Sequence, residues 1–289
     1  MSTNQIPNIV IAGFTGDRSG SMISMGHAPT QGLHSWIVDQ KKSIEENSQI
    51  GKMFVSTFDS KHEIRIDGEN ISDVNITLEQ CRDWMEPRSM TKLYDSAIAD
   101  LDRLIKAKID YERNMPRSLR ILDPKIVIVW ACMTDGADNE SNATVEDFKN
   151  KVKEARDLHD AKCFFLGANQ DAVMTGAQFG FSQDCSLTFG ASGPAAASAL
   201  RSVTQVMREA SQGAQDVGFT QVMRQSSAPA SFGSYDTFDT AMHTPIPSPQ
   251  TNSPYIRPPP MIQRQCAAPL NLRQPVTTLR QPNFDSDTE

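Results

Sequence analysis

The chain has 289 residues and a formal net charge of -7, without a run of basic residues that could follow a nucleic-acid backbone or an anionic membrane. Its longest apolar stretches, such as 126–133, are too short to span a membrane, and the polar start MSTNQIPN lacks the features of a signal peptide. Five widely spaced cysteines without a C-x-x-C pair fit reducing conditions. We therefore expect a cytoplasmic or otherwise intracellular protein that binds neither nucleic acid nor membrane.

The composition changes sharply near residue 213. Eleven of the 17 prolines follow this position, and no lysine does. Segments with few apolar residues and many prolines cannot bury a core and favour extended conformations. We expect one folded domain over residues 1–213 and a disordered tail rich in Pro, Ser and Gln over residues 214–289.

Apolar patterns divide the first 213 residues into alternating strands and helices. Nearly continuous apolar runs rich in β-branched residues predict strands that are covered on both faces. Apolar residues at helical spacing predict helices between them. Strands are expected over 8–14, 125–133, 161–169 and 185–190, and helices over 30–46, 92–109, 143–160, 170–179 and 194–212.

Residues 51–68 read as two strands joined by a tight turn near Asp59 to Lys61, which predicts a hairpin at a sheet edge. Together these elements predict a doubly wound α/β domain with a mostly parallel central sheet, one antiparallel edge strand and helices on both faces. Ligands in such domains bind at the carboxyl ends of the strands. The segments DRSGS and MTDG both fall at these ends.

The glycine-rich segment GFTGDRSGSM at 13–22 is compatible with several kinds of loop. It lacks the lysine of a phosphate-binding loop and the spacing of a dinucleotide fingerprint. A hydrolase is also disfavoured, because no G-x-S-x-G elbow is present. Asp17, Ser19 and Ser21 are spaced two apart, so in an extended loop their oxygens would point the same way. One carboxylate and two hydroxyls suit a hard cation such as Mg²⁺.

Two further segments offer oxygen ligands. MTDGADNES at 133–141 places Asp135 at the end of a predicted strand, and Gly136 lets the backbone turn there. PRSMTKLYDS at 87–96 places Thr91 just before a predicted helix, where its hydroxyl would serve either as an N-cap or as a ligand. The three segments together indicate a cation site built from separate loops.

In their order and spacing, DRSGSM, MTKLYDSAI and MTDGADNES resemble the von Willebrand factor A (vWA) domain with a metal-ion-dependent adhesion site (MIDAS). The resemblance covers about residues 6–190 and is greatest to the intracellular domains of bacteria, phages and large viruses. It implies a Mg²⁺ site, with Mn²⁺ or Ca²⁺ as alternatives. By this resemblance the two serines bind the cation directly, the threonine directly or through water, and the aspartates often through water. The implied site residues are Asp17, Ser19, Ser21, Thr91 and Asp135.

The resemblance further implies a non-enzymatic module in which the cation binds an Asp or Glu of a partner protein. The context Ser89-Met90-Thr91-Lys92 departs from the family pattern. Lys92 would either weaken the binding of the cation or help to hold an acidic ligand. Asp138 and Asn139 are candidate partner contacts, with a solvated turn as the simpler alternative. The tail is a candidate second binding segment. Alternative functions are a structural protein of a virus or phage particle and a regulatory partner of an ATPase or chelatase.

Overall fold

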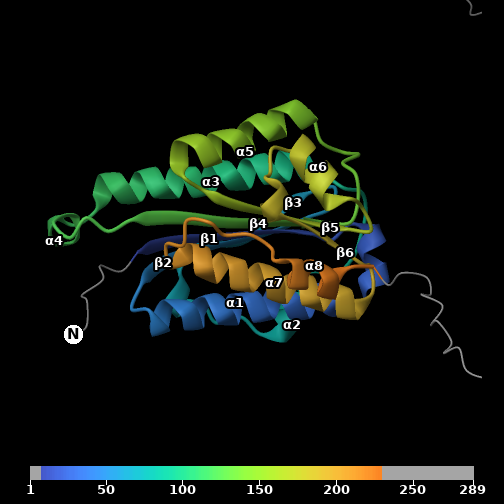
Figure 1. The fold of residues 1–289 in the computed structure, drawn as a ribbon, viewed down its shortest axis with the longest axis horizontal. Helices are drawn as coiled ribbons and strands as arrows, with labels where there is room; N and C mark the ends of the chain where they lie inside the picture. The colour runs from blue at the N-terminus through green and yellow to red at the C-terminus, as the bar shows by residue number, and fades with distance from the viewer. Residues whose placement is uncertain (1–7, 230–289) are drawn as a thin grey trace, which may run out of the picture. The chain divides into compact units, whose positions relative to one another are not determined.

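The computed structural model describes residues 8–229, in which one central sheet is covered by helices on both faces (Figure 1). The sheet has six strands in the order β3-β2-β1-β4-β5-β6. The strands are β1 (Ile9–Asp17), β2 (Ile50–Phe58), β3 (His62–Asn70), β4 (Ile126–Thr134), β5 (Lys162–Ala168) and β6 (Ser186–Phe189). None of the helices in this part of the chain is long and apolar enough to cross a membrane.

The central strands β1 and β4 are buried along their whole length, as their apolar sequences predict. They pair in parallel, and β2, β5 and β6 extend the parallel sheet on either side. Strand β3 pairs antiparallel with β2 through a turn in which the amide of Asp59 donates to the carbonyl of Lys61. The predicted doubly wound sheet with one antiparallel edge strand is therefore confirmed.

The helices form two layers because alternate residues of each strand point to opposite faces. Val10, Ala12 and Phe14 of β1 lie in a core shared with α1 (Ala28–Glu46) and α7 (Gly193–Ser211). Ile9 and Ile11 lie in a core shared with α3 (Leu93–Asn114) and α5 (Val145–His159). Figure 1 shows α3, α5 and α6 on one face of the sheet and α1, α2, α7 and α8 on the other. The helices are α1 (Ala28–Glu46), α2 (Leu78–Trp84), α3 (Leu93–Asn114), α4 (Arg117–Arg120), α5 (Val145–His159), α6 (Ala172–Gln178), α7 (Gly193–Ser211) and α8 (Gln221–Ser227), and the 3-10 helices are η1 (Gly20–Met25), η2 (Ile71–Asp73) and η3 (Gln183–Cys185).

The predicted domain boundary at residue 213 is too early. Helix α8 begins after the N-cap Thr220, and its Met223 packs into the core shared with α7. The guanidinium of Arg224 donates to the carbonyls of Ser186 and Gln183, which fixes the helix against β6. The apolar pattern of α8 is too sparse to be recognised in the sequence, because hydrogen bonds supply much of its attachment. The remainder of the predicted tail, 230–289, lies outside the described residues.

The carboxylate of Asp100 on α3 joins the helix to the sheet from within the protein. Asp100 is only 5% exposed and accepts hydrogen bonds from Thr15 of β1 at 2.6 Å and from Ser56 of β2. It also lies 3.0 Å from His62 Nε2 and 2.8 Å from a guanidinium nitrogen of Arg103. Because α3 follows the loop that carries Thr91, this contact fixes that loop relative to β1.

Replacement of Asp100 by alanine is expected to lower the free energy of unfolding by about 1–3 kcal/mol for each of the two buried hydroxyls, of Thr15 and Ser56, that it leaves without an acceptor. The matched control is Asp102→Ala, on the same helix, whose side chain is 57% exposed and pairs with Lys151. Loss of an exposed ion pair is expected to change stability by at most about 1 kcal/mol. Urea denaturation measures both variants, and equal effects would contradict the assigned role of Asp100.

Candidate metal centre

Asp17 is the last residue of β1 and lies at the carboxyl end of the central strand. Its side chain is fully buried. One carboxylate oxygen accepts from the backbone amide of Ser19 at 2.7 Å, and the other accepts from the hydroxyl of Thr134 at 2.6 Å. Since Thr134 ends the neighbouring strand β4, the carboxylate is held between two strand ends.

The side chains of Ser19 and Ser21 lie near the end of β1, but the backbone that carries them does not have the predicted conformation. The chain is not extended beyond Ser19 but turns into η1 at Gly20. Within this turn the hydroxyls of Ser19 and Ser21 lie 3.1 Å apart, and the hydroxyl of Ser21 donates to Asp135 at 2.7 Å. The predicted convergence is present, but the 3-10 turn produces it rather than the alternation of an extended loop. The buried side chains of Met22 and Met25 hold η1 against the core.

Thr91 joins the same group from the loop before α3. A Cβ atom added to Gly136 would lie 3.8 Å from the hydroxyl of Thr91 and 3.9 Å from that of Ser21, so both hydroxyls face the same small space. Helix α3 begins at Leu93 with Lys92 as its N-cap, so Thr91 does not cap the helix. The role of an N-cap is therefore excluded, and the role of a cation ligand stays a prediction.

The three candidate partner contacts are all engaged within the protein. The side chain of Asn139 accepts from the backbone amide of Thr91 at 2.8 Å, and the backbone amide of Asn139 donates to the carbonyl of Thr91 at 3.0 Å. Asp138 accepts from the amide of Tyr94 at the start of α3, and Lys92 pairs with Asp95 at 3.2 Å. These contacts position the threonine loop, and contact of the three residues with a partner stays a prediction.

Burial controls the protonation of both aspartates. Burial raises the pKa of Asp17 to about 6, against the lowering effect of the hydrogen bonds from Thr134 and Ser19, and nearby Asp135 raises it further. Burial also raises the pKa of Asp135, although the hydrogen bond from Ser21 opposes this shift. A positive charge placed between the two carboxylates would therefore relieve an unfavourable interaction.

An ion-pair network beside the site was not foreseen from the sequence. Arg18, between Asp17 and Ser19, is 1% exposed, and its guanidinium contacts Asp59 at 3.0 Å and also Glu63. Arg88 binds the same two carboxylates, and its backbone amide donates to the carbonyl of Arg18 at 2.7 Å. The network joins the first loop to the hairpin turn and to the loop before Thr91. The sequence did contain a signal for this network, because Arg18 directly follows a buried strand and a buried charge needs a partner of opposite charge.

The donors fit a hard divalent cation. Two carboxylates and three hydroxyls come from the first loop, the threonine loop and the end of β4, and such oxygen ligands of low total charge suit Mg²⁺ or Mn²⁺. The space beside Gly136, which has no Cβ atom, faces two of the hydroxyls. Among residues 8–229 no group of three or more His, Cys, Asp or Glu side chains is placed to hold a metal. The residues Asp17, Ser19, Ser21, Thr91 and Asp135 would hold the cation.

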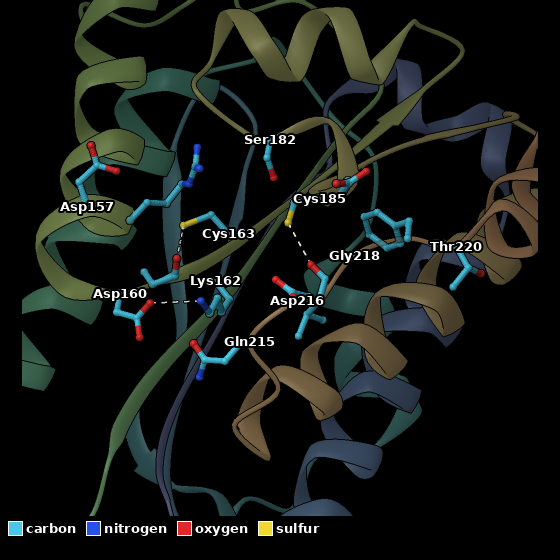
Figure 2. Close-up of a pocket in the computed structure, with 15 residues that line it drawn as sticks. Asp157, Asp160, Lys162, Cys163, Ser182, Cys185, Gln215, Asp216, Gly218 and Thr220 are labelled. Carbon is cyan, nitrogen blue, oxygen red and sulfur yellow. Dashed lines mark hydrogen bonds and ion pairs between the residues drawn. The ribbon is translucent and has the colours of Figure 1, made fainter.

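A cavity of about 550 Å³ lies at the opposite end of the strands from Asp17, where β5 begins (Figure 2). Figure 2 shows Asp160 paired with Lys162 and the thiols of Cys163 and Cys185 on the cavity wall. Burial raises the pKa of Cys163 to about 12 and also raises that of Cys185, so both thiols stay protonated. Asp160 and Lys162 pair with each other, and burial keeps both thiols in the protonated form, which is a poor nucleophile and metal ligand.

No family model and no curated protein matches this chain in sequence. Similar solved structures include proximal thread matrix protein 1 from the mussel byssus with a zinc-occupied MIDAS motif, at 12% identity and a TM-score of 0.41, covering 73% of this chain and 46% of that one. The vWF domain of the type V pili tip protein Mfa5 from Porphyromonas gingivalis is 9% identical with a TM-score of 0.48, covering 74% of this chain and 99% of that domain. A von Willebrand factor type A protein from Catenulispora acidiphila is 13% identical with a TM-score of 0.40, covering 71% and 42%. This chain thus spans less than half the length of the mussel and Catenulispora chains.

The raised pKa of Asp17 gives the metal-free protein a defined pH dependence. Because the folded state binds this proton more tightly than the unfolded state, the contribution of Asp17 to the free energy of unfolding falls as the pH rises from about 4 to about 6. The loss amounts to about 3 kcal/mol, and Asp17→Asn should lack it. Urea denaturation in chelator at a series of pH values measures the difference between the two proteins. A difference that does not change with pH would show that Asp17 is not buried as described.

Proposed function

We propose that this chain is a vWA-type module, without catalytic activity, that binds a divalent cation through Asp17, Ser19, Ser21, Thr91 and Asp135 and recognises a carboxylate of a partner protein through that cation. The observation that carries the proposal is the convergence of five oxygen-bearing side chains from three loops at one end of the sheet. Mg²⁺ is the expected cation, because its preference for oxygen ligands matches this set.

The charge balance of the site favours an acidic partner. The two carboxylates balance the two positive charges of the cation. The three hydroxyls are neutral and are weak electron-pair donors to it. When bound, the cation would act as a Lewis acid toward an added carboxylate oxygen. The side chains of Asp17 and Thr91 are buried, whereas Ser21 is exposed, so the site opens to solvent on the side of η1. A partner carboxylate would approach from that side.

A hydrolytic role has weaker support. The hydroxyl of Ser21 lies beside the carboxylate of Asp135, which resembles part of a nucleophile and base pair. Within the described part of the chain, however, no histidine hydrogen-bonds to either side chain, and the same contact is expected of two ligands that share a cation. A binding role explains both residues together with Thr91.

Replacement of Ser21 by alanine is expected to weaken Mg²⁺ and Mn²⁺ binding by about 10–100-fold, since it removes one oxygen ligand and the hydrogen bond to Asp135. Ser24→Ala is the matched control, because Ser24 lies in the same 3-10 helix and donates only to the carbonyl of Ser21. Isothermal titration calorimetry on the full chain measures both. Equal cation affinities for the two variants would contradict the proposed ligand set.

The partner side of the proposal is tested by affinity capture with the full chain. Proteins captured in Mg²⁺ should be released by chelator, and Asp17→Ala should capture them no better than the chelated protein. Ser24→Ala should behave as the wild type. If capture is unchanged by chelator and by Asp17→Ala, recognition does not pass through the cation.

A further inference from the structure

We infer that a second binding site lies beneath the last turns of α3, in an apolar pocket that takes a small organic anion with an apolar body about twice the size of benzene. The pocket lies between these turns and the hairpin of β2 and β3. About 20 Å of helix separates it from the loop that carries Thr91. The inference therefore goes beyond the proposed function and does not depend on it.

The size and lining of the pocket suit a small molecule. Its volume is about 300 Å³. An apolar cavity of about 150 Å³ binds benzene, so this pocket has room for a bicyclic body. Pockets of this volume with apolar walls and a few polar groups are the usual form of small-molecule sites. The apolar walls are formed by Phe54, Ala107, Tyr111, Met115 and Pro116.

A β-bulge in the hairpin shapes one wall. Met53 of β2 pairs with Glu69 of β3, but the next residue, Phe54, pairs with Asp67, so Gly68 is the extra residue. Gly68 has a φ of 73°, which glycine adopts readily. A Cβ atom at this position would lie only 2.9 Å from the ring of Phe54. The bulge and its glycine thus make room for the ring that forms the wall.

The ring of Phe54 is held in place from a second direction. It is 8% exposed, and the guanidinium of Arg103 lies 5.3 Å from its centroid. Arg103 is itself fixed by ion pairs with Asp100 at 2.8 Å and with Asp67 at 2.7 Å. This wall is therefore already positioned without a ligand, which lowers the entropy that binding would cost.

Lys52 gives the pocket a preference for an anion. Residues 52 and 54 of β2 point to the same face of the sheet because side chains alternate along a strand, so the ammonium lies on the side of the pocket. Among the described residues that line the pocket, Lys52 is the sole basic side chain. One positive charge beside apolar walls matches a monocarboxylate rather than a polyphosphate.

The carboxylate on the pocket wall does not neutralise Lys52. Asp110 pairs with Lys106, one turn before it on α3, at 2.7 Å. The hydrogen bond from Lys106 lowers the pKa of Asp110, and the charge of Arg113 lowers it further, although desolvation opposes both. Within residues 8–229, Lys52 forms no ion pair of its own. A ligand carboxylate would supply the missing counter-ion, and the amide of Asn114, which also lines the pocket, can donate to it.

Isothermal titration calorimetry with 2-naphthoate and its neutral amide, 2-naphthamide, tests the inference on the full chain. Both probes have the bicyclic body that the volume allows, and only the first carries a charge. The titrations are performed in chelator, so that no cation at the strand ends can hold the carboxylate. The naphthoate should bind about tenfold more tightly than the amide, because it alone forms a charge-assisted hydrogen bond with Lys52.

Two variants locate the binding. Lys52→Met keeps the apolar stem and should remove the tenfold preference, whereas Lys61→Met, at the exposed turn of the same hairpin, should retain it. Ala107→Trp should weaken the binding of both probes at least tenfold, because the indole would fill the pocket. Ala107 is only half-buried on α3, and circular dichroism checks that this variant is folded.

The outcomes are decisive in either direction. If 2-naphthoate shows no saturable binding, or binds no more tightly than the amide, the pocket is not a site for organic anions. Unchanged binding in both Lys52→Met and Ala107→Trp would place the probe elsewhere and overturn the inference equally. If Ala107→Trp does not fold, the comparison of Lys52→Met with Lys61→Met decides. Because chelator is present throughout, the result stands whether or not Mg²⁺ binds at the strand ends.

Discussion

The carboxylate of Asp17, fully buried at the carboxyl end of the central strand, is the constraint on which this end of the molecule depends. Its two oxygens are occupied by the amide of Ser19 and the hydroxyl of Thr134, so the first loop must turn and β4 must end where they do. Burial makes the charged form of this group unfavourable in the absence of a cation. The protein thus maintains a local electrostatic cost in its fold that ligand binding can relieve.

Ion pairs and hydrogen bonds link the loops around Asp17 to each other. Arg18 joins the first loop to the hairpin turn through Asp59, and Arg88 joins the threonine loop to the same carboxylate. Asn139 pairs with Thr91 through both a side-chain and a backbone hydrogen bond. A displacement of one loop would break contacts in the other two, so under the proposed function the side chains that would hold the cation are already positioned in its absence. Such preorganisation lowers the entropy lost on binding.

Much of the fold and of the site could be predicted from the sequence, for identifiable reasons. Strands β1 and β4 are continuous apolar runs, and the predicted ligands Asp17 and Asp135 stand at or directly after the ends of these runs. Thr134 and Arg18 were missed because their importance comes from contacts with residues far away in the chain. Helix α8 was missed because hydrogen bonds to β6, rather than an apolar stripe, attach it. The 3-10 helix η1 was also not predicted, because the spacing of Asp17, Ser19 and Ser21 does not indicate where the extended chain ends.

The strand order places residues 17, 91 and 135 at one point although more than a hundred residues separate the first from the last. Contacts of such long range form late in folding, because the loops between them must close first. A chain that has not yet added β4 to the sheet therefore has no complete site. A cation that binds only the finished arrangement shifts the folding equilibrium by mass action toward the native state. Occupancy of the site would then report that the whole sheet has assembled, and a partner that requires the cation would be shielded from incompletely folded copies.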